Sequence, residues 1–296
     1  MMLKKLFKKL YQIIPFKRKL YVFLNSFLNF PQNIYKHLHF KGEIKVEVDE
    51  SRGFKMNHYG FQVENDVFWS GLYGSWERVS LKLWTLLCEK STVIVDVGAN
   101  TGIYTLLAKT VNINSIVYAF EPIERVYLKL VQNIELNDFR ITPINEALSD
   151  QNGKAIVYDT NAEHTYSVAV NKNLNQSGIE SIEREINIKR LDSFIKKNNI
   201  QRIDLMKIDV ETHEAEVLEG MGVFLERFKP HLLIEILDDE IASNVERILN
   251  GLGYQYFEID EQAGISAKNH INVGSSRNYL CFNNKADPDI LNSFKF

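Results

Sequence analysis

The segment Val93–Gly102 constrains the fold of this chain more than any other part of its sequence. It reads Val-Ile-Val-Asp-Val-Gly-Ala-Asn-Thr-Gly, a β-branched apolar run that carries Asp96 and then breaks into a turn rich in glycine. A helical pattern follows over residues 102–111. This order predicts a buried strand, a tight turn that lets the backbone approach a ligand, and the N-terminus of a helix.

The same alternation of strand and helix continues along the chain. Core strands are predicted at Val93–Val97, Ile116–Phe120, Ile141–Asn145, Leu205–Asp209 and Leu232–Ile236. Helices are predicted at Glu77–Glu89, Gly102–Val111, Ile123–Asn137, Leu191–Asn198, Ala215–Phe228 and Glu240–Asn250. Repeated α/β steps favour a doubly wound parallel sheet. Tyr254–Ile259 and Asn278–Phe282 add two closing strands, so we expect a Rossmann-like α/β fold whose seven-stranded sheet ends in an antiparallel hairpin.

Two parts of the chain depart from this rhythm. Residues 43–69 alternate weakly, at Ile44, Val46, Val48, Phe61 and Val63, and predict short strands that enter the domain. The aromatic segment Phe68–Glu77 follows, and its rings suit either sugar stacking or core packing. A polar insertion at about 153–190 carries two further strands, Ala155–Tyr158 and Glu185–Arg190. The loop between them, residues 159–182, has the length of a lid or binding loop.

Charge divides the chain into a basic arm, residues 1–42, and an acidic body, residues 43–296. The arm holds nine Lys or Arg residues and no Asp or Glu, which leaves 26 basic against 38 acidic residues for the body. An acidic body does not suit a nucleic-acid backbone. We therefore expect the body to be the catalytic domain, with its core at about 70–240, and to bind no nucleic acid.

The arm carries two apolar stripes at helical spacing, with lysines between them. The first is Leu3, Leu6, Phe7, Leu10, Ile13 and Ile14, and the second is Leu20, Phe23, Leu24, Phe27 and Leu28. A basic amphipathic helix of this kind binds an anionic membrane surface, here through residues 1–31. The alternatives are packing on the catalytic domain, packing on a second subunit in a homo-oligomer, and contact with nucleic acid.

Several features bear on where the protein resides. No segment reaches the ~20 apolar residues that span a bilayer, and the arm has no evident secretory cleavage site. Cys88 and Cys281 lie in apolar runs and are too few for a disulfide framework. We expect a cytoplasmic protein, peripheral on the inner face of the membrane where the arm binds it.

The turn after the first core strand favours S-adenosylmethionine (SAM) as the ligand. Asp96, Gly98, Asn100 and Gly102 supply an acid and a turn that permits close backbone approach and left-handed geometry. The Gly-x-Gly-x-x-Gly spacing of a pyrophosphate binder is absent. Glu121 ends the second strand, where a carboxylate accepts hydrogen bonds from a ribose diol. Glu146 follows the third strand, at the edge where adenine would lie.

Charged residues also gather where the fourth and fifth strands end. Asp209, Glu211 and His213 follow Leu205–Ile208, and Glu235 falls at the same edge of the next strand. Charge in an apolar strand is costly unless paired, so Lys207 is expected to pair with one of these acids. The carboxyl ends of strands bind ligands in open α/β sheets. The acids therefore provide candidate proton acceptors, or alternatively a Mg²⁺ site made by Asp209, Glu211 and Glu235; our assignment includes no metal.

Together these segments resemble the FkbM-type SAM-dependent methyltransferases over about residues 70–240. The likeness rests on Glu235 and on four segments, Val93–Gly102, Ala119–Pro122, Arg190–Phe194 and Leu205–Glu211. One departure stands out: the family usually has glycine after the Glu of its Asp-Val-Glu motif, and this chain has Thr212. Threonine adopts positive φ only at a cost, so we expect the local turn to differ.

The resemblance implies methyl transfer to a hydroxyl of a sugar, a glycoconjugate or a small-molecule intermediate. An alcohol needs a general base within hydrogen-bond reach, and the candidates are His213, Glu211 and Asp209. With a membrane-bound arm, a lipid-linked glycan is an attractive acceptor. Two alternatives stay open: an NAD-dependent oxidoreductase or epimerase, and a non-enzymatic scaffold that retains the fold.

Overall fold

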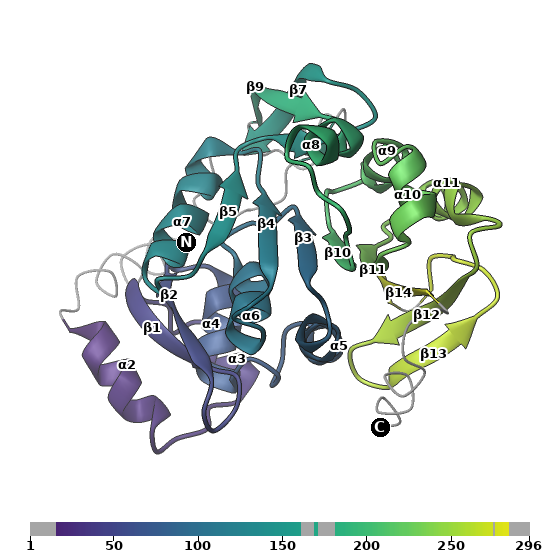
Figure 1. Cartoon of the computed structure of the whole chain (residues 1–296). Coiled ribbons are helices and arrows are strands. Elements are labelled where there is room, and N and C mark those ends of the chain that lie inside the picture. Colours follow the sequence, from purple (N-terminus) through teal and green to yellow (C-terminus); the bar gives the residue numbers. More distant parts are fainter. Residues whose placement is uncertain (1–15, 161–168, 171–180, 275, 284–296) are drawn as a thin grey trace.

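The computed structural model describes residues 16–160, 169–170, 181–274 and 276–283. Eight of its strands form one sheet, ordered β13-β12-β14-β11-β10-β3-β4-β5 (Figure 1). The five expected core strands are confirmed to within one residue at each end: β3 (Val93–Val97), β4 (Ile116–Phe120), β5 (Ile141–Ile144), β10 (Leu205–Ile208) and β11 (His231–Glu235). All five pair in parallel, so their carboxyl ends meet at one edge of the sheet.

The closing part of the sheet has one more strand than expected. β14 (Asn278–Asn283) lies between β11 and β12 (Tyr254–Asp260) and is antiparallel to both. β13 (Gly264–Lys268) then pairs with β12 at the sheet edge, where Asp260 Oδ1 accepts the backbone N–H groups of Gln262 and Ala263. The expected seven strands are therefore eight. β13 was missed because most of its side chains face solvent and carry no apolar alternation.

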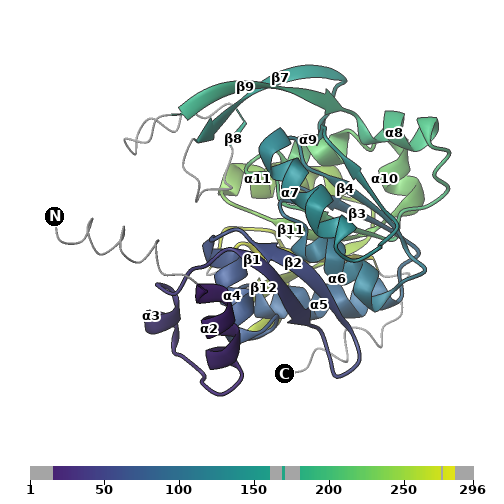
Figure 2. The same ribbon diagram turned by 90° about the vertical axis from the view of Figure 1, so that its left-hand side faces the viewer.

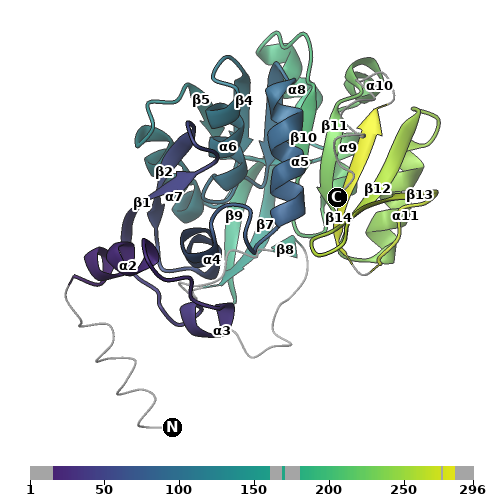
Figure 3. The same ribbon diagram turned by 90° about the horizontal axis from the view of Figure 1, so that it is seen from below.

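Helices cover both faces of the sheet, which Figure 3 shows fanning from β5 to β13. One face packs against α5 (Arg78–Glu89), α6 (Ile103–Val111) and α7 (Glu124–Glu135). The other packs against α8 (Leu191–Lys197), α9 (Glu214–Glu219), α10 (Val223–Phe228) and α11 (Asp239–Leu249). The single helix expected over Ala215–Phe228 is wrong. The chain turns at Gly220–Gly222, where a Cβ on Gly220 would lie 2.1 Å from the Ser149 carbonyl oxygen.

The segment before β3 folds as a hairpin followed by a helix. β1 (Gly42–Glu47) and β2 (Gly53–His58) pair in antiparallel register and confirm the strands expected near Ile44 and Val46. The strand expected at Phe61 and Val63 is wrong, because Phe61 caps α4 (Gln62–Ser70) and Val63 lies inside it. Two or three alternating residues cannot distinguish a strand from the first turn of a helix.

The second stripe of the arm lies only partly in a helix: α2 (Lys17–Asn25) holds Leu20, Phe23 and Leu24, and Phe27 and Leu28 follow it. The short α3 (Gln32–Tyr35) comes next. Tyr21 is buried against Phe40 and Trp69, and it anchors α2 to the body. Trp69 thus serves core packing rather than sugar stacking. The first stripe, residues 3–14, lies outside the described residues. In the part of the chain that is described, no helix is both long enough and apolar enough to cross a bilayer.

The insertion forms a separate small sheet, ordered β6-β9-β7-β8, which arches over the carboxyl ends of the core strands (Figure 2). β7 (Gly153–Thr160) and β9 (Ser181–Lys189) are the two strands expected there, and β6 (Ala147–Leu148) and β8 (Ala169–Val170) are additional. Val157, Ile186 and Ile188 bury their side chains against Ile123 and Val126 at the start of α7. Most of the expected polar loop, residues 159–182, lies outside the described residues.

Candidate active site

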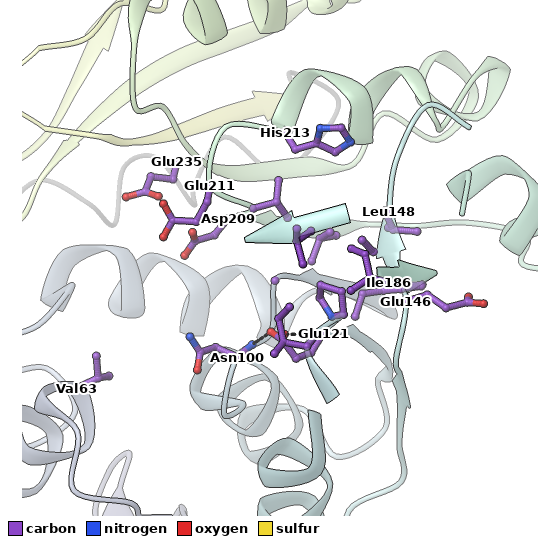
Figure 4. Close-up of a pocket in the computed structure, with 18 of the residues that line it drawn as sticks. Val63, Asn100, Glu121, Glu146, Leu148, Ile186, Asp209, Glu211, His213 and Glu235 are labelled. Carbon is purple, nitrogen blue, oxygen red and sulfur yellow. Dashed lines mark hydrogen bonds between the residues drawn. The ribbon is translucent and has the colours of Figure 1, made fainter. Parts of the chain in front are cut away.

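A cavity of about 390 Å³ opens at the carboxyl ends of β3, β4, β10 and β11, under the insertion sheet (Figure 4). Its floor comes from the turns after these strands. Apolar walls come from α4, the start of α7 and the insertion, through residues that include Val63, Ile123, Leu148, Val157 and Ile186. Among the described residues, seven titratable side chains line the cavity: Glu77, Glu121, Glu146, Asp209, Glu211, His213 and Glu235.

The turn after β3 has the backbone geometry expected of it. Gly98, Asn100 and Gly102 adopt φ of 82°, 52° and 98°. The N–H groups of Gly98 and Ala99 both donate to the Phe120 carbonyl oxygen, at 3.0 and 2.9 Å. A Cβ on Gly98 would lie 1.9 Å from the Asp209 carbonyl oxygen, so only glycine lets the ends of β3 and β10 approach this closely.

Glu121 joins this turn to the next strand end. It is 6% exposed, and its carboxylate accepts the N–H groups of Asn100 at 3.1 Å and Ile123 at 2.9 Å. Burial raises the pKa of Glu121 to about 7, against the effect of these two hydrogen bonds. Each carboxylate oxygen keeps a further lone pair, so the group can still accept from hydroxyls inside the cavity.

Asp96 lies beneath the turn and is fully enclosed. Its Oδ2 accepts a hydrogen bond from Thr105 Oγ1 at 2.5 Å, and its Oδ1 is buried with no partner among the described residues. Asp96, Lys207 and Asp209 line a smaller pocket that adjoins the turn. Burial raises the pKa of Asp96, while Lys207 opposes the rise. The unpartnered oxygen therefore suits a cationic or N–H donor of a ligand.

Lys207 is the buried counter-ion at this end of the sheet. Its Nζ lies 2.6 Å from Asp209 Oδ2 and 4.6 Å from the centre of the Tyr104 ring, which confirms the pairing expected of it. Burial alone would lower the pKa of this ammonium, but Asp209, Glu77 and Asp96 raise it above its usual value. Lys207 therefore stays charged and compensates only part of the surrounding negative charge.

Asp209, Glu211 and Glu235 gather on one side of the cavity, away from Glu121 and Asn100 (Figure 4). The pKa of Glu235 is raised to about 8, mainly by burial and in addition by the nearby Asp209 and Glu211 carboxylates. Like charges this close disfavour simultaneous ionisation. At neutral pH, Glu235 therefore readily holds a proton.

The turn that carries Glu211 is strained. Glu211 and Thr212 adopt φ of 55° and 85°, so threonine takes the positive φ despite its cost. The buried Glu214 carboxylate holds the turn, because its Oε1 accepts the N–H groups of Val210 at 3.2 Å and Thr212 at 3.3 Å. Strain of this kind persists only where surrounding contacts enforce it, and it clusters at functional sites.

A family model described as the methyltransferase FkbM domain matches residues 96–256, more than half of the chain. The chain belongs to the FkbM methyltransferase family. This membership confirms the FkbM resemblance and SAM as the cofactor, and it argues against an NAD-dependent oxidoreductase and against a scaffold.

The sequence identity between this chain and individual relatives is low. The hexuronic acid methyltransferase AglP of Haloferax volcanii is 29% identical over 168 residues, which are 55% of this chain and 63% of that protein. The chain thus spans less than two thirds of the length of that relative. Among solved structures, the methyltransferase FkbM of Methylobacillus flagellatus has a TM-score of 0.41 at 17% identity, covering 65% of this chain and 44% of that one. The fibrillarin of Aeropyrum pernix has the same score at 12% identity, with 81% of each chain covered.

Two of the expected site residues, Glu146 and His213, have partners that direct them away from the centre of the cavity. Glu146 accepts from Lys189 Nζ at 2.7 and 2.5 Å, and its carboxylate points outward in Figure 4. His213 has Nε2 2.9 Å from Ser149 Oγ and Nδ1 3.5 Å from Glu216 Oε2. His213 Nε2 is therefore hydrogen-bonded to a residue outside the cavity lining, and Nδ1 lies near a second such residue.

Sequence reasoning missed Glu77, Tyr104 and Glu214 as parts of the FkbM site. Glu77 lines the cavity, and its Oε2 accepts the Tyr104 hydroxyl at 2.6 Å. Burial raises the pKa of Glu77 and of Glu214 to about 7. No local signal distinguishes these residues, because each is brought to the site by tertiary packing. Within the described ranges, no group of three or more His, Cys, Asp or Glu side chains is placed to hold a metal ion.

Proposed function

We propose that this protein transfers the methyl group of SAM to a sugar hydroxyl. The observation that carries the proposal is the cavity itself. In it, the glycine turn after β3 and the Glu121 carboxylate, which is placed to accept ribose hydroxyls, lie opposite a cluster of carboxyl groups. The name of the Haloferax relative supports a sugar as the acceptor. SAM brings an electrophilic methyl group on a sulfonium, and the chain must orient the acceptor oxygen and take up its proton.

Each side of the cavity suits one part of this reaction. Gly98, Asn100 and Gly102 hold the methionine portion of SAM, with the Asp96 carboxylate beneath its ammonium. Glu121 accepts the ribose hydroxyls, and the apolar side chains of Ile123 and Leu148 flank adenine. Glu146 borders the adenine region, where its bond to Lys189 fixes it. Asp209, Glu211 and Glu235 then face the acceptor.

Glu211 is our choice of general base among the three candidates. Asp209 already accepts a hydrogen bond from the Lys207 ammonium at 2.6 Å. The Nε2 atom of His213 is already hydrogen-bonded to Ser149 Oγ. Glu211 lines the cavity on the strained turn, beside Glu235. We assign His213 to positioning of the turn rather than to proton transfer.

Calorimetric titration with SAM tests the cofactor site. Replacing Glu121 by alanine removes two hydrogen bonds to a charged acceptor, each worth about 1.5 kcal/mol or more, so we expect SAM to bind about 100-fold more weakly. Asp96→Ala is expected to weaken binding similarly. The control is Glu185→Gln, an exposed carboxylate paired with Lys154 on the insertion. Unchanged affinity in both site variants would remove the assignment. Labelled SAM and glycan extracts, with mass spectrometry of the product, then identify the acceptor hydroxyl.

A membrane surface is a second partner that we propose, on the evidence of α2. Tyr21 and Asn25 fix this helix to the body, the latter by a 2.8 Å bond to the Phe68 carbonyl oxygen. Apolar rings in this helix and beside its two ends lie in solvent: Phe16, Phe23 and Phe27 are 73%, 62% and 74% exposed. Basic residues flank them in the arm. An apolar stripe bordered by lysines is the pattern of a helix that lies in an anionic interface.

Co-sedimentation of the full chain with phosphatidylserine vesicles and with phosphatidylcholine vesicles tests this partner. We expect binding to the anionic vesicles only, lost in a Phe23→Ser, Phe27→Ser double variant. The control is Val223→Ser, because Val223 on α10 is 74% exposed but lies outside the arm. Equal binding by the double variant and the parent would exclude α2 as the membrane-binding element, and a monomer produced only by the double variant would indicate a dimer interface instead.

A further inference from the structure

The three tryptophans of the chain lie in different surroundings. Trp84 is fully buried, and its indole N–H donates to the Tyr104 carbonyl oxygen at 2.9 Å. Trp69 is 5% exposed, and its N–H donates to the Leu38 carbonyl oxygen at 3.3 Å. Trp76 is partly exposed and lines both the cavity and the smaller pocket beside the turn. Its N–H has no acceptor among the described residues, so the fold itself leaves this donor unused.

Tyr104 orients the Trp76 ring. The planes of the two rings lie at 78° to each other, with their centres 6.2 Å apart, in an edge-to-face contact. Whichever ring presents its edge, a contact of this kind covers no more than one face of the indole. Because Trp76 also lines the cavity, the Tyr104 contact leaves ring surface available to a ligand that enters there.

Glu77, the next residue, offers a hydrogen-bonding oxygen at the same place. It lines the cavity, and its Oε2 accepts the Tyr104 hydroxyl at 2.6 Å. No hydrogen bond reaches its Oε1 from the residues that the structure describes. Glu77 also adopts φ of 42°, a left-handed conformation that is costly for a residue with a Cβ. Backbone strain of this kind persists where surrounding contacts enforce it, and it clusters at functional sites.

Contacts on both sides of Trp76 and Glu77 hold the pair in place. A Cβ on Gly74 would lie 1.9 Å from the Ser70 carbonyl oxygen, so the turn that precedes the pair is tightly closed. After the pair, the Glu261 carboxylate, between β12 and β13, accepts the N–H of Val79 at 2.6 Å. Groups that are fixed before a ligand binds lose less conformational entropy when it arrives.

From this arrangement we infer that Trp76 and Glu77 form the subsite that binds the acceptor sugar. The indole stacks on the apolar C–H face of a pyranose ring, and Glu77 Oε1 binds one of the hydroxyl groups at the edge of that ring. Ligand pockets commonly combine an aromatic wall with a few polar groups that fix orientation. The inference rests on the proposed function and adds the residues that bind its acceptor.

Binding of simple sugars to the full-length protein, saturated with S-adenosylhomocysteine, tests this subsite without catalysis. Calorimetry first measures the binding of S-adenosylhomocysteine. The probes are the methyl glycosides of glucose, galactose and mannose, together with the open-chain polyol sorbitol, and ligand-observed NMR measures their affinities. We expect at least one glycoside to bind. Sorbitol has hydroxyl groups but no ring face, so we expect it to bind about tenfold more weakly than that glycoside, or weaker still.

Variants of the pair show whether these two side chains bind the sugar. Trp76→Leu removes the ring but keeps an apolar side chain, and it should weaken glycoside binding by about fivefold or more. Trp76→Phe restores a stacking surface and should lose less than about threefold. Glu77→Ala should resemble Trp76→Leu, and Glu77→Gln, which keeps an acceptor oxygen, should resemble Trp76→Phe. The matched control is Phe228→Leu, which removes a partly buried ring on α10, outside the cavity, and should leave glycoside binding unchanged.

Each failure has a distinct meaning. If Trp76→Leu leaves glycoside binding unchanged, or if no glycoside binds the saturated parent, the subsite assignment is overturned while cofactor binding stands. If Trp76→Leu instead weakens SAM binding and leaves S-adenosylhomocysteine binding intact, the ring lies against the cationic sulfonium and not the acceptor, which also overturns the assignment. Failure of the parent to bind S-adenosylhomocysteine would overturn the proposed function from which the assignment follows.

Discussion

The two sides of the cavity hold their carboxyl groups in different ways. On the β3 and β4 side, Glu121 accepts two backbone N–H groups and Asp96 accepts the Thr105 hydroxyl. On the β10 and β11 side, the Asp209 carboxylate accepts the Lys207 ammonium, and Glu211 lies on a turn that adopts positive φ. The first side has acceptors arranged before any ligand arrives. The second side retains repulsion and strain that an acceptor and a transferred proton can relieve.

Glu211→Gln should produce the largest effect, because it removes the proposed base from the second side alone. We expect kcat to fall about 10³-fold, within the range for loss of a general base, while the Kd for SAM changes less than threefold. His213→Gln should lower kcat less than tenfold. Both are measured with the acceptor found in the labelled-SAM assay. A larger loss in His213→Gln than in Glu211→Gln would reverse our assignment of the base.

Gly98→Ala should push apart the ends of β3 and β10, which belong to the two sides of the cavity. Its Cβ would lie 1.9 Å from the backbone oxygen of Asp209, and φ at this position is 82°. We expect a loss of about 3 kcal/mol or more in the free energy of unfolding. Gly102→Ala is the matched control, since its Cβ would meet the movable Leu130 side chain at 2.6 Å and should cost clearly less. Denaturant unfolding measures both, and equal losses would mean that the contact between strand ends is unimportant.

The raised pKa of Glu235 makes the stability of the second side depend on pH. A carboxyl with a pKa of about 8 in the folded protein, against an unfolded value of 4.5, keeps its proton longer in the folded state. Ionisation therefore destabilises the folded protein as the pH rises from about 4.5 to 8. Glu235→Gln avoids this cost, so its stability relative to the parent should grow by roughly 1–2 kcal/mol between pH 5 and pH 8, after allowance for partial exposure.

Thermal unfolding at several pH values measures this difference. A comparison of each variant with the parent at the same pH cancels the titration of other buried groups, such as His58 and His231, whose pKa burial lowers. Glu185→Gln should show a difference that does not change with pH. A flat difference for Glu235→Gln as well would show that the carboxyl groups of the second side do not repel one another appreciably.

The same contrast separates what the sequence predicts from what it does not. The backbone of the turn after β3 was predicted correctly, because Gly98, Asn100 and Gly102 have conformational preferences that a short window of sequence reveals. The carboxyl cluster was placed correctly at the strand ends, since parallel strands align their carboxyl ends. The residues that support this cluster were not predicted. Glu77 and Glu214 act through contacts that arise only when distant elements pack.

Two errors in the fold have the same origin. β13 has one buried residue, Gly264, and its remaining side chains are partly or fully exposed, so its pairing with β12 leaves no periodic signal. At Phe61 and Val63 the apolar alternation was too short to identify α4, whose buried face includes the polar residues Glu64, Asn65 and Asp66. Patterns of hydrophobicity identify elements that bury apolar side chains, and they miss elements that face solvent or bury polar groups.

The smallest expected effect concerns the strain at Thr212. A β-branched residue at φ 85° is unfavourable by roughly 1–2 kcal/mol, and glycine removes most of this cost. Glycine also gains entropy in the unfolded chain, which offsets part of the benefit. We therefore expect Thr212→Gly to raise the free energy of unfolding by about 0.5–1 kcal/mol, measured with denaturant.

Thr212→Ala is the control for this change, because alanine keeps a Cβ at the same φ and should bring a smaller gain. If both variants stabilise the protein equally, branching at Cβ rather than positive φ is the source of strain. If Thr212→Gly destabilises it, the turn is not strained in the folded protein. A gain in stability with a fall in kcat would show that the strain helps to hold Glu211 toward the acceptor, which is the feature that sets this side of the cavity apart from the cofactor side.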